Sequence, residues 1–106
     1  MPFIHTGDLD PIEKRKGWSG RLFHSQNMTF VHWRFENGAD IHEHAHPQEE
    51  VWEILSGALE VTIDGVTQVA RPGVVAIIPP NAAHSVRVVR AGVAIVIDHP
   101  IRPDFA

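Results

Sequence analysis

Short apolar segments separated by turn-forming residues limit what this chain can fold into more than any other feature. From Gly20 onward, runs rich in Val, Ile, Phe and Trp alternate with Gly, Pro, Asn and Asp. This pattern is typical of an all-β domain. Because no segment has sustained helical periodicity, a sandwich or barrel is predicted rather than a sheet with helical crossovers. The expected strands cover residues 21–25, 29–36, 41–46, 50–55, 58–63, 66–70, 74–78, 84–89 and 93–98.

Two shorter signals add detail to this prediction. Asp64-Gly65 stands between two apolar runs, and both residues readily adopt the positive φ of a type I′ hairpin turn. We therefore expect a hairpin that joins residues 58–63 to residues 66–70. Before the strands, Pro11 suits the first position of a helix, so one helical turn is expected at residues 10–16.

Length and sequence pattern indicate one domain. A chain of 106 residues can bury one ordinary core and is too short for two. We expect a barrel core at about 20–98, an N-terminal arm at 1–19 and a tail at 99–106 that wraps over the barrel. No apolar stretch is suited to export or to crossing a bilayer, so a cytoplasmic protein without membrane contacts is expected.

Charge and cysteine content exclude several classes of function. The formal net charge is −4 and no basic run is present, which argues against a nucleic-acid partner. Cysteine is absent, so a disulfide framework, a thiolate metal site and a cysteine nucleophile are excluded. A small-molecule ligand or substrate remains the expected partner.

Histidine is the residue type whose distribution stands out. Three of the eight histidines, His42, His44 and His46, fall within five residues. Alternate residues of a strand share a face, so these three side chains can point the same way. After a turn at Pro47, Glu50 can return to the same ion from the next strand. Imidazole and carboxylate together suit Zn, Mn, Fe, Ni or Cu. The alternative is an exposed loop in which these residues are merely solvated.

The spacing in this segment resembles the first motif of the cupin family, G-x5-H-x-H-x3-E-x6-G. Every position of the motif is matched, by Gly38, His44, His46, Glu50 and Gly57. The match favours the metal site over the solvated loop.

A second segment resembles the second cupin motif, G-x5-P-x-G-x2-H-x3-N. Gly73, Pro79 and His84 match it, and two positions depart from it. Asn81 stands where glycine is usual, a mild change because Asn also adopts left-handed backbone conformations at low cost. Val88 stands where asparagine is usual and removes a polar side chain.

The resemblance covers about residues 20–98 and implies a jelly-roll barrel (a double-stranded β-helix) of the small single-domain bacterial type. It implies one divalent transition metal, Zn, Ni, Mn, Fe or Cu, held inside the barrel by four ligands. Similar small cupins form homodimers, which cover the edge strands that a single jelly roll leaves open. The implied ligands are His44, His46, Glu50 and His84.

Two histidines need separate treatment. His84 begins a strand in an apolar stretch, where a single histidine is usually an ordinary core residue. Since three other candidate ligands lack a fourth, we interpret His84 as a ligand. The motif does not explain His42, which either contacts a ligand, serves as an occasional fifth ligand or is simply exposed near the barrel mouth.

The end of the chain resembles a subgroup, the pectin-degradation cupins, which end in P-x-R-x-D-F and open unsaturated uronates to linear keto forms. Residues 100–105 match that ending. The resemblance implies that Arg102 pairs with a substrate carboxylate, a task suited to a planar guanidinium. Val96 and Asp98 occupy places where the subgroup has an acid and an aromatic residue, and Glu50 stands where it often has glutamine.

Further residues are candidates to line the cavity. If Glu50 faces inward, alternation turns Trp52 the same way, either as a wall of the substrate pocket or as ordinary core. In residues 31–35, Val31, Trp33 and Phe35 share a face that is expected to fill the core. If the faces are reversed, His32 and Arg34 approach the metal instead.

Three functions remain open from the sequence. The first is a Lewis-acid enzyme for a small sugar acid or keto acid, with Arg102 as anion binder and Asp98, His32 or a water moving protons. The second is an Fe(II)-dependent dioxygenase, because the same ligands can hold iron. The third is a ligand-binding module without turnover. The identity of the metal discriminates between the first two.

Overall fold

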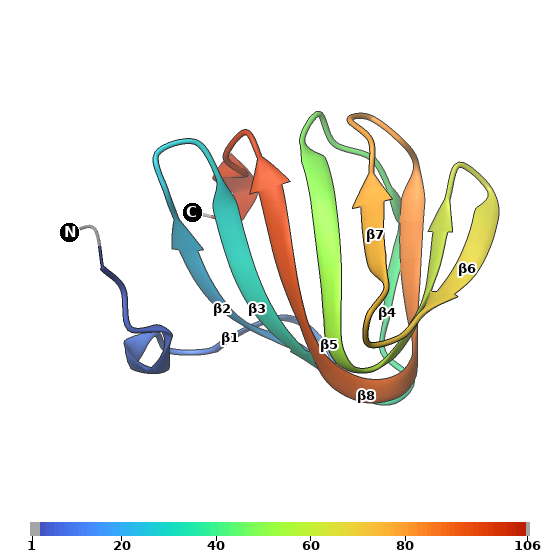
Figure 1. Ribbon diagram of the computed structural model, residues 1–106, viewed down its shortest axis with the longest axis horizontal. Coiled ribbons are helices and arrows are strands. Elements are labelled where there is room, and N and C mark those ends of the chain that lie inside the picture. The colour runs from blue at the N-terminus through green and yellow to red at the C-terminus, as the bar shows by residue number, and fades with distance from the viewer. Residues whose placement is uncertain (1–2, 106) are drawn as a thin grey trace.

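The computed structural model describes residues 3–105 and consists mainly of antiparallel strands, as predicted (Figure 1). Each strand belongs to one continuous hydrogen-bonded network. In this part of the chain, no helix is long and apolar enough to cross a membrane. The strands are β1 (Ile12–Arg15), β2 (Trp18–His24), β3 (Thr29–Phe35), β4 (Asp40–His44), β5 (Glu49–Ile63), β6 (Val66–Ala70), β7 (Val75–Ile78) and β8 (His84–His99), and two short 3-10 turns are η1 (Thr6–Asp8) and η2 (Pro103–Phe105).

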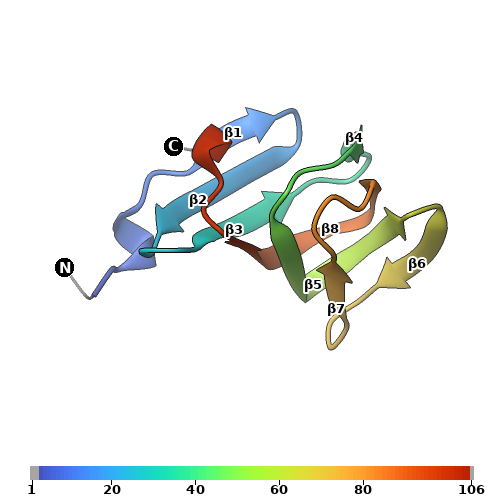
Figure 2. The same cartoon turned by 90° about the horizontal axis from the view of Figure 1, so that it is seen from above.

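Two long strands, β5 and β8, hold the fold together. They pair with each other along nearly their whole length and bend midway, so each contributes to both layers. In one layer the order is β1-β2-β3-β8-β5-β7, and in the other it is β4-β8-β5-β6. The two layers face each other, as the view from above shows (Figure 2). This arrangement is the predicted jelly-roll barrel.

Three tryptophans pack edge to face at the centre of the core. The ring centroids of Trp18 lie 5.9 Å from those of both Trp33 and Trp52. Trp18 is fully buried, and its Nε1–H donates to the carbonyl oxygen of Asp40 at 3.1 Å. Val31, Trp33 and Phe35 point inward, as the alternation predicts. The strand expected at residues 21–25 begins three residues earlier, at Trp18, because Trp18 pairs with Phe35 of β3.

The helical turn predicted for residues 10–16 is wrong. Residues 12–15 form β1, in which Ile12 pairs with Gly20 and Glu13 with Ser19. A single helical turn is costly to nucleate, whereas the open edge of β2 offers ready hydrogen-bond partners. Lys14 is an extra residue in this pairing, between Glu13 and Arg15.

The prediction also divided each long strand in two. Residues 50–55 and 58–63 are one strand, and so are residues 84–89 and 93–98, because the ladder continues through bulges at the bend. Gly57, at φ +77°, and Gly92 let the two backbones approach there. The predicted hairpin turn is confirmed, with φ +48° at Asp64 and +81° at Gly65.

The bend supplies a test of the packing. A Cβ at Gly57 would lie 2.5 Å from two backbone carbonyl oxygens, of Arg90 and Ala91, whereas a Cβ at Gly65 meets open space. Since both glycines have similar positive φ, Gly65→Ala should cost only backbone strain, about 1 kcal/mol. Gly57→Ala should cost about 3 kcal/mol or more, because the clash adds to the strain. Urea unfolding of both variants measures the difference, and equal costs would contradict the close approach.

Candidate metal centre

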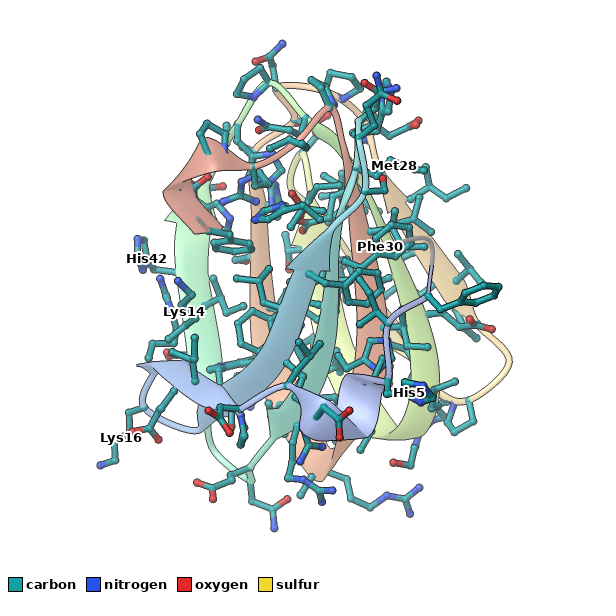
Figure 3. The ribbon with its side chains drawn as sticks, turned by 90° about the vertical axis from the view of Figure 1, so that its left-hand side faces the viewer. His5, Lys14, Lys16, Met28, Phe30 and His42 are labelled. Atoms are coloured by element: carbon teal, nitrogen blue, oxygen red, sulfur yellow. The ribbon has the colours of Figure 1, made fainter. Side chains whose placement is uncertain are left out.

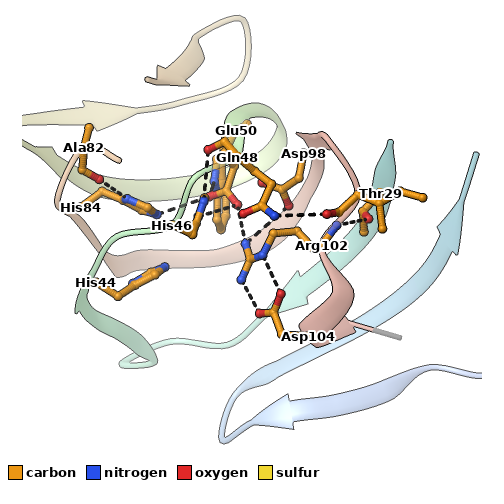
Figure 4. Close-up of polar contacts among 12 residues, drawn as sticks. Thr29, His44, His46, Gln48, Glu50, Ala82, His84, Asp98, Arg102 and Asp104 are labelled. Atoms are coloured by element: carbon orange, nitrogen blue, oxygen red, sulfur yellow. Dashed lines mark hydrogen bonds and ion pairs between the residues drawn. The ribbon is translucent and has the colours of Figure 1, made fainter. Parts of the chain in front are cut away.

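Four predicted ligands meet inside the barrel (Figure 4). His44 ends β4 and lies directly opposite His84, the first residue of β8, with ring centroids 4.2 Å apart. His46 follows in the loop to β5, and its ring centroid is 4.9 Å from that of His84. Glu50 points inward from β5 and is only 5% exposed. The pairing of β4 with β8 therefore brings together residues that are forty positions apart.

Backbone carbonyl groups orient the three imidazoles. In each ring the Nδ1 atom lies 2.8 to 3.1 Å from the carbonyl oxygen of a residue two positions away. Because a carbonyl oxygen can only accept, Nδ1 carries the hydrogen, and the lone pair of the neutral ring is on Nε2. This is the usual orientation of a metal-binding histidine.

The Nε2 atoms are the buried polar groups that need a partner. His46 Nε2 and His84 Nε2 are buried and make no hydrogen bond within residues 3–105. They lie 3.5 and 3.6 Å from the two carboxylate oxygens of Glu50. Nitrogen atoms of His44, His46 and His84 are within 4.8 Å of one another. These residues fit a divalent transition metal, which would satisfy the orphaned nitrogen atoms.

Burial and the Glu50 carboxylate shift the pKa values of three groups in the cluster. Burial lowers the pKa of His44, which favours the neutral imidazole. Burial opposes ionisation of Glu50, but the neighbouring imidazoles of His46 and His84, 3.5 and 3.6 Å away, hold the Glu50 pKa well below the ordinary value. For His84 the cost of burial is outweighed by the same carboxylate, which raises the His84 pKa.

Asp98 carries a second buried carboxyl group next to the cluster. Its side chain points inward from β8, is fully buried, and makes no hydrogen bond in the described part of the chain. One of its oxygen atoms lies within 4.8 Å of Glu50. Burial and the neighbouring Glu50 raise the pKa of Asp98 to about 9. This shift favours the neutral acid form of Asp98 at pH 7, beside an ionised Glu50.

The C-terminal tail closes the other side of the site. Arg102 is buried, and its Nη1 donates to Glu50 Oε2 at 3.3 Å. Its Nε and Nη2 donate to both oxygens of Asp104, at 2.9 and 2.6 Å. Phe105 covers the guanidinium, with Cζ 4.4 Å from the ring centroid. The predicted anion binder thus already holds a carboxylate, from a side chain that is 58% exposed.

The cluster opens into a cavity of about 300 Å³. Trp33, Trp52, Val86 and Val96 form apolar walls. Its rim includes Lys14 of β1, whose Nζ lies 5.3 Å from the ring centroid of Phe105 in η2. In the view from above, the C-terminal turn lies beside β1 (Figure 2). The remaining lining comes from Arg15, Trp18, Ile41, His42, His44, Glu50, His84, Arg102, Asp104 and Phe105.

The comparison with known proteins decides the family. Residues 31–99, well over half of the chain, match the model of the cupin domain. The chain belongs to the cupin family. No curated protein matches it.

Solved cupin structures share the whole fold. An RmlC-like cupin from Shewanella frigidimarina superposes with a TM-score of 0.93 at 24% identity, over 100% of this chain and 96% of that one. KdgF from Halomonas superposes with a TM-score of 0.92 at 21% identity, over 100% and 99%. Oxalate decarboxylase from Bacillus subtilis gives 0.82 at 19% identity, over 92% of this chain and 29% of that one. At these identities the similarity establishes the fold.

The two departures from the cupin motifs are accommodated structurally. Asn81 has φ +65°, the left-handed conformation that glycine usually supplies, and its N–H donates to the carbonyl oxygen of His46 at 2.8 Å. The turn that precedes His84 therefore also supports the loop that carries His46. Val88 is buried and fills the hydrophobic core.

The other candidate residues of this cupin fall into two groups. Trp52 is both core and pocket wall, and its Nε1–H donates to Glu50 Oε1 at 2.7 Å. His42 is exposed at the cavity mouth, 3.2 Å from an Arg15 nitrogen, where Figure 3 shows it beside Lys14. His32 is not brought to the site, because it lies on the outer face of β3 against Phe23.

Several cavity residues were missed from the sequence. Lys14 and Arg15 reach the cavity because β1 is a strand with a bulge, not a helical turn. Trp18 was assigned to the arm, although it belongs to the core. Asp104 and Phe105 were visible in the P-x-R-x-D-F ending, but only the structure shows that they pack on Arg102.

The buried acid predicts how stability depends on pH in metal-free protein. Folding raises the Asp98 pKa from 3.8 to about 9, so the stability this group contributes is complete below pH 3.8 and is lost as the pH rises through about 9. Asp98→Asn should remove that slope and become progressively more stable than wild type between pH 4 and 9. Urea unfolding across this range measures the difference.

Asp104→Asn is the matched control, because the contribution of Asp104 to stability depends on pH in the opposite direction. Arg102 lowers the pKa of Asp104, so its contribution is present above the ordinary pKa and is lost only in acid. The prediction for Asp98 would be contradicted if the free energy of unfolding of Asp98→Asn and of wild type changed with pH in parallel. That result would show that Asp98 is ionised in the folded protein at neutral pH.

Proposed function

We propose that this cupin is a metal-dependent enzyme that acts on a small sugar acid or keto acid of the uronate type. The supporting observation is that the backbone-oriented imidazoles of His44 and His84, the Glu50 carboxylate and the buried guanidinium of Arg102 line one cavity. The third imidazole, that of His46, lies next to Glu50. His44, His46, Glu50 and His84 would hold the metal. When bound, a divalent metal would supply a Lewis acid that polarises a carbonyl or hydroxyl oxygen.

Arg102 would bind the substrate carboxylate. Its Nη1 is tied to Glu50, which fixes the guanidinium plane next to the metal ligands. The edge formed by Nε and Nη2 faces Asp104, in the two-pronged arrangement that a carboxylate prefers. A substrate carboxylate would take the place of Asp104, which lies in the short terminal turn and is largely exposed.

Asp98 would hold the proton that the reaction moves. It is neutral at pH 7, it adjoins Glu50, and its Oδ2 lies 3.6 Å from Arg102 Nη1. A neutral buried acid can donate a proton to a substrate oxygen or carbon and recover it afterwards. Trp52 fixes Glu50 by its hydrogen bond, so that Glu50 serves as ligand and leaves proton transfer to Asp98.

The size of the cavity and the end of the chain support the substrate class. A volume of about 300 Å³ is at the small end of the range for small-molecule sites, about 300–1,000 Å³. The apolar walls would exclude water from one side of the ligand. Residues 100–105 supply the uronate class through their resemblance to pectin-degradation cupins, and the shared fold with KdgF from Halomonas is compatible with it.

Metal content tests the ligand set. Protein purified without chelator should contain about one divalent metal per chain, and His44→Ala should lose most of it, because one of four ligands is removed. His42→Ala is the matched control, two positions away and exposed, and should keep the metal. Elemental analysis of all three samples, with circular dichroism to check folding, decides the point. Equal metal content in wild type and His44→Ala would reject the ligand set. Stoichiometric iron would favour the Fe(II)-dependent dioxygenase over the Lewis-acid enzyme.

Binding of galacturonate, a saturated uronate, tests the role of the tail in metal-loaded protein. Arg102→Lys should weaken binding by about tenfold or more, because the two-pronged contact is lost. Asp104→Asn should strengthen binding several-fold, because the competing carboxylate is gone. Arg87→Lys, which alters a surface pair with Glu60, should bind like wild type.

Titration calorimetry measures these affinities, and turnover of unsaturated uronates and keto acids is assayed on the same samples. If Asp104→Asn instead weakens binding, Asp104 only positions Arg102. If fully metal-loaded wild type neither binds nor converts any of these acids, the metal site stands and the substrate class is rejected.

A further inference from the structure

Two successive residues of β1, Lys14 and Arg15, both line the mouth of the cavity. Successive residues of a regular strand point to opposite faces, so only one of the two would ordinarily reach it. The ladder between β1 and β2 is irregular at this point, because Glu13 pairs with Ser19 and Arg15 with Trp18. Lys14 is the extra residue of a bulge, a feature that redirects side chains and is common beside active sites. The bulge therefore lets both cations face the same opening.

Each of the two cations is held by a neighbour that also lines the cavity. Arg15 Nη1 donates to Nδ1 of His42 at 3.2 Å. Lys14 Nζ lies 5.3 Å from the ring centroid of Phe105, and Cζ of Arg102 lies 4.4 Å from the same centroid. Both distances are within the range of a cation–π contact. One aromatic ring thus connects the cations at the mouth with the guanidinium beside the candidate metal ligands.

In the described part of the chain, neither Lys14 nor Arg15 has a carboxylate partner. This is so although the chain as a whole carries a formal net charge of −4. The two carboxylates that line the cavity, Glu50 and Asp104, are both paired with Arg102. The two cations at the mouth are therefore available to an anion that enters from solvent.

We propose that Lys14 and Arg15 bind a second anionic group of the ligand, so that the cavity selects sugar acids with an anion at each end. The inference rests on the proposed role of Arg102, which would hold the first carboxylate. The second group, a carboxylate or a phosphate, would lie against Lys14 and Arg15. A single sugar skeleton suits the separation, because Lys14 and Arg102 lie against the same ring and the cavity measures only about 300 Å³.

Two other roles for these cations lead to different expectations. If they only attract anions from a distance, removal of any nearby cation has a similar effect. If Lys14 only holds Phe105 in place, its loss disturbs Arg102 and weakens every ligand alike. Direct contact with a second anion is the one case in which the effect depends both on these two side chains and on the far end of the ligand.

A matched pair of ligands tests the inference in metal-loaded protein. Galactonate and galactarate share a linear six-carbon skeleton and one carboxylate, and only galactarate carries a second carboxylate at the far end. Wild type should bind galactarate about tenfold more tightly or better, as measured by titration calorimetry. In the double variant Lys14→Gln/Arg15→Gln this preference should fall to about twofold, the statistical advantage of two equivalent ends. Galacturonate 1-phosphate, compared with galacturonate, tests a phosphate as the second group.

Lys16→Gln is the matched control. It removes a charge of the same sign next to Arg15, from a side chain that does not line the cavity. Figure 3 shows Lys16 apart from Lys14 and His42. Lys16→Gln should keep the wild-type preference, and circular dichroism checks that both variants fold. An equal loss of preference in Lys16→Gln, or equal weakening of galactonate and galactarate in the double variant, overturns the inference.

Arg102→Lys separates this inference from the proposed function. Suppose that galactonate and galacturonate bind and that Arg102→Lys weakens them, but that neither galactarate nor the sugar phosphate binds more tightly. The second anion site is then rejected, and the role of Arg102 stands. If wild type binds none of the four acids, both are rejected. A preference for the phosphate alone supports the inference and identifies the second group.

Discussion

The buried carboxylate of Glu50 is the group on which the rest of the site depends. A charge that is 5% exposed must be compensated, or it destabilises the fold by several kcal/mol. The compensation comes from both near and distant residues: Trp52 in the same strand, His46 in the preceding loop, His84 at the start of β8 and Arg102 in the tail. Because all these partners contact the same carboxylate, Glu50 holds the loop before β5, the two long strands and the C-terminal tail in one arrangement. Asp98 can remain protonated beside it, because Glu50 already carries the local negative charge.

Arg102 is likewise a buried charge, and carboxyl groups from different parts of the chain surround it. Its guanidinium contacts Glu50 and Asp104 and lies near Asp98, so one positive charge stands among three carboxyl groups, of which Asp98 is neutral. Glu50 and Asp98 are buried, and only Asp104 is open to exchange with solvent. If Arg102 binds an anionic ligand as proposed, that ligand could replace Asp104 without leaving a buried charge unpaired. The cost of replacing Asp104 would be limited, because this side chain is 58% exposed and the ligand carboxylate would take over its contacts with Arg102. Asp104 would thus keep the guanidinium paired when no ligand is bound.

Much of this arrangement follows from sequence patterns. Alternation predicted correctly that Glu50, Trp52 and Trp33 face inward, because a residue spacing of two leaves only one choice once a single face is known. The turn at Asp64-Gly65 followed from local backbone chemistry. The strand β1 did not, because four residues that pair only with an edge have no local signal of their own. The neutral state of Asp98 and the pairing of Asp104 with Arg102 depend on how the tail packs, and no local pattern in residues 98–105 specifies that contact.

Alternation also links the two faces of the larger layer. Glu50 and Asp98 point into the barrel, and their chain neighbours Val51 and Ile97 point out, onto the outer face of the layer. Any contact that immobilises Val51 and Ile97 therefore also restrains the backbone that carries Glu50 and Asp98. Metal ligands bind best when they are held in place beforehand, because less conformational entropy is lost on binding. Packing on the outer face of this layer therefore bears on how firmly the candidate ligands are held, although Val51 and Ile97 themselves contribute no atom to the cluster.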